Sequence, residues 1–129
     1  MRAADMTKKR PKHLALHQIK LPLPSVVSIL HRLSGALLFL ALPLLLLMFQ
    51  YSLNSIETHT RLVETLDEPL VKLPLIGLLW AFLHHFCAGI RYLLIDLHIG
   101  SDLAGARTGS KWVMGVSLLL TVFLGAKLW

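Results

Sequence analysis

Two long runs without a charged side chain constrain the fold of this sequence more than any other feature. The first run covers residues 33–56 and has 24 residues, and the second covers residues 73–90 and has 18. A helix needs about 20 predominantly apolar residues to cross the hydrocarbon core of a bilayer. Both runs therefore predict transmembrane helices.

A third, shorter uncharged run covers residues 112–126, 15 residues in all. Lys111 and Lys127 at its ends can extend their charges toward the headgroups, and Trp112 and Trp129 suit the two membrane interfaces. The chain is 55% hydrophobic and only 16% charged, which is unsuitable for a solvated surface. We therefore expect an all-α integral membrane protein with three transmembrane helices.

Prolines and loop-forming residues predict where these helices begin and end. Pro22 and Pro24 precede the first run, and proline at or before a first turn is a helix-start signal. Residues 1–24 are expected to be a basic cytoplasmic segment, and residues 25–129 the transmembrane domain. We expect a short external loop over residues 54–69, which can include a surface helical turn, and an internal loop over residues 100–110. The three helices are predicted over residues 25–51, 73–97 and 111–128.

The charge distribution predicts the orientation of the chain. Residues 1–32 contain seven Lys or Arg and one Asp, whereas residues 54–72 contain four acids and two bases. By the positive-inside rule, the N-terminus is cytoplasmic, the acidic loop lies outside, and the C-terminus is periplasmic. This segregation also argues against a nucleic-acid partner for the net charge of +6.

The N-terminal region also indicates in which membrane the chain resides. The first apolar stretch begins too late and is too long for a cleaved signal peptide, and the first dozen residues lack the Arg- and Ser-rich pattern of a transit peptide. We therefore expect a multi-pass protein of a bacterial inner membrane. The single Cys87 permits no disulfide framework and is expected to be a small packing residue.

His85 is the strongest candidate for chemistry. It is twelve residues from each predicted end of its helix, roughly 18 Å from either membrane face. An imidazole there needs a partner, and both a haem iron and a hydrogen-bonding group on another helix satisfy it. His84 points about 100° away and remains an alternative ligand. The small Ala88 and Gly89 leave room for a flat macrocycle or for a closely packed helix.

Cations occur on the cytoplasmic side of His85. Arg91 lies roughly 9 Å nearer the cytoplasm, where with His31 or Arg32 it can bind haem propionates. Snorkelling or pairing with Asp96 explains Arg91 equally well.

Ser28 and Arg32 are four residues apart and share a helix face at the inner edge of the membrane. They offer a hydroxyl and a guanidinium to a quinone carbonyl, although an arginine bound to lipid phosphate is the simpler alternative.

Two sequence runs resemble the cytochrome b subunits of succinate dehydrogenase. The run S-I-L-H-R-L-S-G, from Ser28 to Gly35, follows an R-P dipeptide at Arg10 and Pro11. The run H-F-C-A-G-I-R-Y-L-L-I-D extends from His85 to Asp96. With the three spans, the resemblance covers nearly the whole chain.

The resemblance implies a membrane anchor that packs with a second hydrophobic anchor subunit into a helical bundle, with one haem b between them and one axial histidine from each. His85 is then the ligand of the haem iron, Ser28 and Arg32 line the ubiquinone site, and His31 contacts a propionate, with Arg91 as a further propionate partner. A flavoprotein subunit and an iron–sulfur subunit would oxidise succinate and pass electrons toward the quinone. No residue of this chain is expected to be catalytic by itself.

Some features depart from the family pattern. Tyr92 occupies a place where some relatives have a second histidine, so a propionate contact there would either be weaker or be supplied by the phenol. His13 and His17 make the lead-in over residues 12–20 unusual. The sequence also permits the anchor of a quinol:fumarate reductase, or a haem-free structural subunit.

Overall fold

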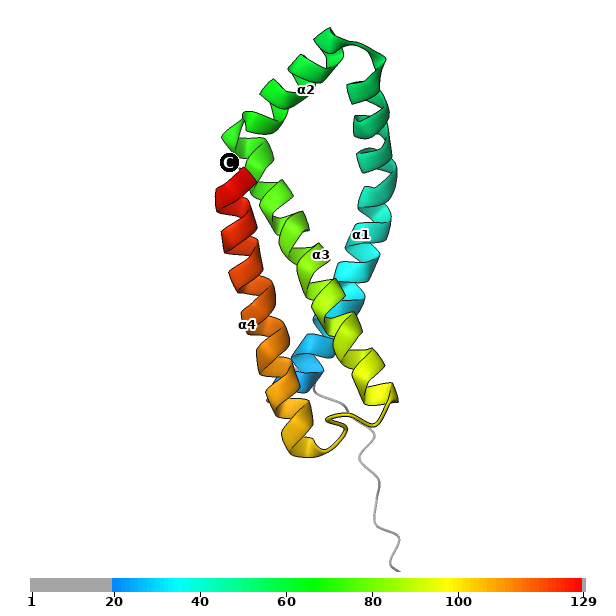
Figure 1. The fold of residues 1–129 in the computed structure, drawn as a ribbon, viewed down its shortest axis with the longest axis vertical. Helices are drawn as coiled ribbons and strands as arrows, with labels where there is room; N and C mark the ends of the chain where they lie inside the picture. The colour runs from blue at the N-terminus through cyan, green and yellow to red at the C-terminus, as the bar shows by residue number, and fades with distance from the viewer. Residues whose placement is uncertain (1–19, 129) are drawn as a thin grey trace, which may run out of the picture.

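The computed structural model describes residues 20–128; the greater part of the predicted basic segment, residues 1–19, and Trp129 lie outside the described residues. The described residues form four helices and no strand, which confirms the all-α prediction (Figure 1). The helices are α1 (Leu23–Asn54), α2 (Ile56–Asp67), α3 (Pro69–Asp96) and α4 (Leu103–Leu128).

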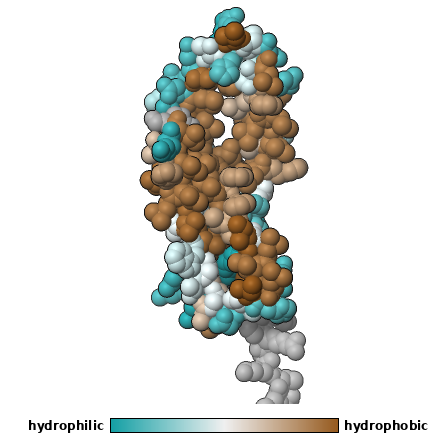
Figure 2. Space-filling model, viewed as in Figure 1, coloured by the Kyte–Doolittle hydropathy of each residue, from teal (hydrophilic) through white to brown (hydrophobic). Residues whose placement is uncertain are grey.

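Three of these helices, α1, α3 and α4, are long and apolar enough to cross a membrane, which confirms the three predicted spans. Figure 2 shows apolar side chains covering the middle of the molecule and polar side chains gathered toward its two ends. Large apolar side chains such as Leu40 and Leu119 are more than 70% exposed. A lipid environment makes this surface favourable, because the hydrocarbon replaces the water that such side chains avoid.

All three membrane helices begin before their predicted first residues. Helix α1 begins at Leu23, directly after Pro22, and continues through Pro43 to Asn54. Helix α3 begins at Pro69, four residues before the predicted start, because proline at the first helical position loses no backbone hydrogen bond.

Helix α4 begins at Leu103, although residues 100–110 were expected to form a loop. The turn that precedes it is short because His98 and Gly100 both adopt positive φ angles, 64° and 67°, and reverse the chain in a few residues. Backbone bonding then starts immediately, with the Ala106 N–H donating to the Asp102 carbonyl at 2.8 Å. Gly105 and Gly109 suggested a loop, but inside α4 they serve close packing instead.

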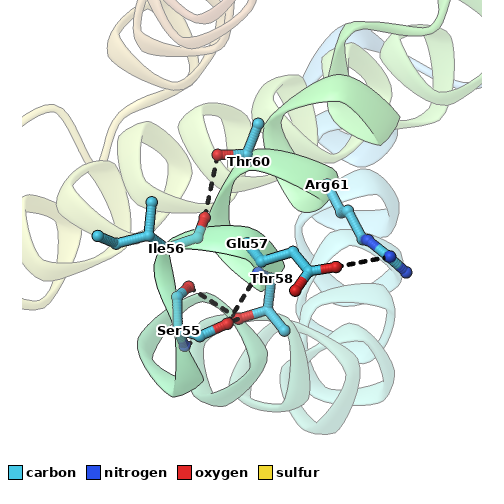
Figure 3. Close-up of polar contacts among 6 residues, drawn as sticks. All are labelled: Ser55, Ile56, Glu57, Thr58, Thr60 and Arg61. Atoms are coloured by element: carbon cyan, nitrogen blue, oxygen red, sulfur yellow. Dashed lines mark hydrogen bonds and ion pairs between the residues drawn. The ribbon is translucent and has the colours of Figure 1, made fainter.

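The acidic segment forms a 12-residue helix, α2, where a short loop that can include a helical turn was expected. A capping box begins this helix: the Ser55 hydroxyl accepts from the Thr58 N–H at 3.1 Å, and the Thr58 hydroxyl accepts from the Ser55 N–H at 3.0 Å (Figure 3). An ion pair between Arg61 and Glu57, 2.7 Å long, adds one contact on its exposed face (Figure 3). Helix α2 joins α1 to α3 at the end of the molecule far from the start of α1 (Figure 1).

Helix α3 packs against both α1 and α4, and the three helices meet around Val27, Ala88 and Val113. From there α1 and α3 diverge toward α2 (Figure 1). Between the diverging parts lies an apolar cavity of about 670 Å³, lined by Leu30 to Met48 of α1 and Val71 to Ala81 of α3. The closest packing, and with it the candidate site, is therefore in the half of the molecule where α1 begins.

Candidate haem and quinone site

The His85 ring is hydrogen-bonded to the backbone of α1. Its Nδ1 lies 3.0 Å from the His31 carbonyl oxygen and 3.3 Å from the Ser34 hydroxyl oxygen, and that hydroxyl donates to the same carbonyl at 2.9 Å. A carbonyl only accepts, so this contact requires the proton on Nδ1 and leaves a free lone pair on Nε2 of the neutral ring. Nε2 forms no hydrogen bond with any residue of the described range 20–128.

The side chain of His31 also contacts this ring. The imidazoles of His31 and His85 stack with their centroids 4.3 Å apart and their planes 12° apart. Tyr92, seven residues after His85 and hence on the same face of α3, lies with its ring centroid 5.1 Å from that of His31. We call His31, His85 and Tyr92 the aromatic cluster.

Two glycines border the aromatic cluster and differ in their surroundings. A Cβ atom added at Gly35 would lie 2.8 Å from Cε1 of His85, closer than real Cβ atoms approach, and a tight 3.2 Å from its Nδ1. A Cβ added at Gly89 would meet only Nε2 of His31, at an ordinary 3.8 Å. Close packing of the ring on α1 thus requires glycine at position 35, whereas position 89 has room beside it.

His84 has the opposite environment. It is fully buried, with its ring centroid 5.2 Å from that of Trp80. Neither of its ring nitrogens, nor the indole nitrogen of Trp80, has a hydrogen-bond partner among the described residues. The two adjacent histidines therefore differ sharply: one ring is enclosed by protein, and the other is half-buried with a free nitrogen.

Arg91 lies on the side of α3 that faces α4. Its side chain is packed against Gly109, where an added Cβ would lie 3.2 Å from Nε, and its Nη2 donates to the Ala106 carbonyl at 3.3 Å. The alternative of an ion pair with Asp96 is not realised; both ion pairs of the described region, Arg61–Glu57 and Lys72–Asp67, involve other residues. Arg91 is a 9% exposed residue, and its guanidinium thus has a neutral partner and no carboxylate among residues 20–128.

The predicted quinone residues line a cavity of about 420 Å³ between α1 and α3. The structure brings Ser28 and Arg32 of α1 together there with Arg91 and Tyr92 of α3. Tyr92 also belongs to the aromatic cluster, so the cavity and the cluster adjoin. No role was predicted for Ser34 or Gly35, although they follow His31 by three and four residues and these positions flank the His31 carbonyl in a helix.

The family model described as the succinate dehydrogenase/fumarate reductase transmembrane subunit matches residues 6–124, which include the whole candidate site. The chain belongs to this family. The predicted family is thereby confirmed, and the three apolar helices make this member a multi-pass membrane protein.

Relatives within the family are similar over most of their length. The succinate dehydrogenase cytochrome b556 subunit of Coxiella burnetii is 34% identical over 125 residues, which cover 96% of this chain and 100% of the relative. The subunit of the same name from Rickettsia felis is 30% identical, with 93% and 94% covered. The mitochondrial succinate dehydrogenase cytochrome b560 subunit of Dictyostelium discoideum is 27% identical, with 86% and 58% covered.

Proposed function

We propose that this family member is the cytochrome b anchor of a succinate dehydrogenase, which binds haem b through His85 and ubiquinone in the cavity beside Ser28 and Arg32. The observation that carries the proposal is the hydrogen bond of His85 Nδ1 to the His31 carbonyl, because it leaves the Nε2 lone pair free to ligate a metal. A histidine that ligates a metal generally has its other nitrogen bonded in this way.

The surrounding residues fit a haem. A Cβ added at Gly89 would meet only Nε2 of His31, at 3.8 Å, so α3 is uncrowded at that position, and Arg91 is a buried cation without a carboxylate partner among the described residues. Arg91 and His31 would hold the propionates through charge-assisted hydrogen bonds. When bound, haem b would supply a one-electron redox centre, and a second protein ligand to its iron would come from a second hydrophobic anchor subunit.

The cavity residues fit a quinone headgroup. The Ser28 hydroxyl and the Arg32 guanidinium would donate to a quinone oxygen, and the fixed cation would stabilise negative charge that develops there during reduction. Flavoprotein and iron–sulfur partner subunits on the cytoplasmic side of the membrane would carry out the oxidation of succinate. This chain would therefore bind and position haem b and the quinone, and succinate would be oxidised elsewhere in the complex.

The proposed orientation places the start of α1 on the cytoplasmic side of a bacterial inner membrane and α2 outside. It is supported by the basic residues that precede α1, by the acidic α2 at the far end of the molecule, and by the bacterial sources of the most similar relatives above. The names of these relatives also favour succinate oxidation over the fumarate-reducing alternative.

The test is an absorption spectrum of the intact purified complex with its subunits identified by mass. We expect a reduced b-type spectrum that His85→Leu abolishes while the subunits remain assembled. His84→Leu is the matched control, one residue away on the same helix, and should keep the spectrum. A native complex without haem, or an unchanged spectrum in His85→Leu, would refute the proposal.

A further inference from the structure

The contact between His85 and α1 depends on an exposed backbone carbonyl. In a helix, the carbonyl of residue i points toward the side chains at i+3 and i+4. For His31 these are Ser34 and Gly35. A large side chain at either position would cover the oxygen, but a hydroxyl that bonds to it and a glycine leave it accessible to a ring from α3.

Gly35 sets how closely that ring approaches. The His85 ring lies where the first side-chain carbon of any other residue at position 35 would be, 2.8 Å from Cε1. Because the ring is also stacked on His31, it cannot slide sideways along α1 without losing that contact. Adding a methyl group at position 35 would therefore push the ring outward, away from the His31 carbonyl.

Ser34 places a second oxygen near the His85 N–H. Its hydroxyl donates to the His31 carbonyl at 2.9 Å, which directs an oxygen lone pair toward His85 Nδ1 at 3.3 Å. The ring N–H thus faces two oxygens fixed relative to each other. Ser34 is 5% exposed, so water cannot readily replace its hydroxyl.

We propose that Gly35 and Ser34 are positioning residues for the proposed haem ligand His85: together they expose and orient the oxygens that hold the His85 N–H, so that Nε2 points to one fixed place. This inference rests on the proposed role of His85. It extends that role to two residues of α1 that would not themselves touch the iron. Such outer partners fix the tautomer and orientation of a ligand imidazole and tune its basicity.

The experiment compares Gly35→Ala with Gly115→Ala in the intact complex. Gly115 also lies in a membrane-spanning helix, but a Cβ there meets nothing within 4 Å. We expect Gly35→Ala to shift the low-spin ferric EPR signal and to let ferrous haem bind carbon monoxide, because a displaced ring ligates weakly. Gly115→Ala should match the wild type. An unshifted EPR signal in assembled Gly35→Ala would overturn the inference.

If Gly35→Ala prevents assembly, the variants Ser34→Ala and Ser34→Thr test the inference instead, because serine to alanine is a small change in a helix. Ser34→Ala should shift the EPR signal and the haem midpoint potential, and Ser34→Thr should restore both by returning the hydroxyl. A wild-type signal and potential in Ser34→Ala would overturn the inference. Loss of haem in His85→Leu alongside that result would leave the proposed function intact, whereas haem retained in His85→Leu would refute both.

Discussion

The imidazole rings of His31 and His85 lie nearly parallel, 4.3 Å apart, although 53 residues separate them in the chain. His31 contacts the other ring in two ways, through its own side chain and through its backbone carbonyl. A substitution removes the first contact and keeps the second. The two contributions can therefore be separated by mutation.

His31→Leu should leave the haem ligated, because the carbonyl that holds His85 Nδ1 belongs to the backbone. We expect a low-spin spectrum with a shifted midpoint potential, since the stacked ring and a proposed propionate contact are lost. A redox titration of the purified complex measures both. Complete loss of low-spin haem in an assembled complex would show that the side chain of His31, rather than its carbonyl, supports ligation.

Arg32→Leu should impair quinone reduction far more than succinate oxidation by a soluble artificial acceptor. Hydrogen bonds to charged groups contribute about 1.5–3 kcal/mol, so the expected loss is roughly 10- to 100-fold in the quinone-dependent rate. Arg107→Leu is the matched control, because Arg107 is an exposed arginine of α4 outside the cavity. An equal loss of both activities in Arg32→Leu would instead indicate failed assembly.

His84→Leu should leave the stability of the complex unchanged or raise it. A buried polar group without a partner costs about 1–3 kcal/mol, and the two ring nitrogens of His84 have none among the described residues. Leucine has a similar volume and removes this cost. Thermal unfolding of the purified complex provides the measurement, and a clearly lowered midpoint would mean that His84 has a partner in the assembly.

Gly105→Ala should destabilise the turn between α3 and α4. The added Cβ would lie 2.7 Å from Cα and 2.8 Å from the carbonyl oxygen of Gly100, and backbone cannot yield as a flexible side chain can. Overpacking of this kind costs about 1–3 kcal/mol. Gly125→Ala, in the same helix with nothing within 4 Å of the new atom, should be neutral or slightly stabilising. Equal unfolding midpoints for the two variants would contradict the crowding at Gly105.

Much of the fold could be predicted because membrane insertion depends on local sequence. The long uncharged runs specify α1, α3 and α4, since each charge placed in hydrocarbon costs free energy whatever the neighbouring helices do. Helix α2 was missed because its capping box uses Thr58 in the place where glutamate or glutamine is the usual signal. The start of α4 was missed because Gly105 and Gly109 were interpreted as loop residues.

The sequence alone determined that this chain crosses the membrane three times and carries two adjacent histidines deep in its second span. Only the tertiary structure decided their environments: His85 is bonded to α1 through the His31 carbonyl, and His84 is enclosed beside Trp80. Neighbouring residues on a helix differ by about 100° in direction, and the rotation of each helix about its axis is fixed by packing against the others. Gly35, Ala88 and Gly109 provide that packing, because small residues are what let these helices approach closely.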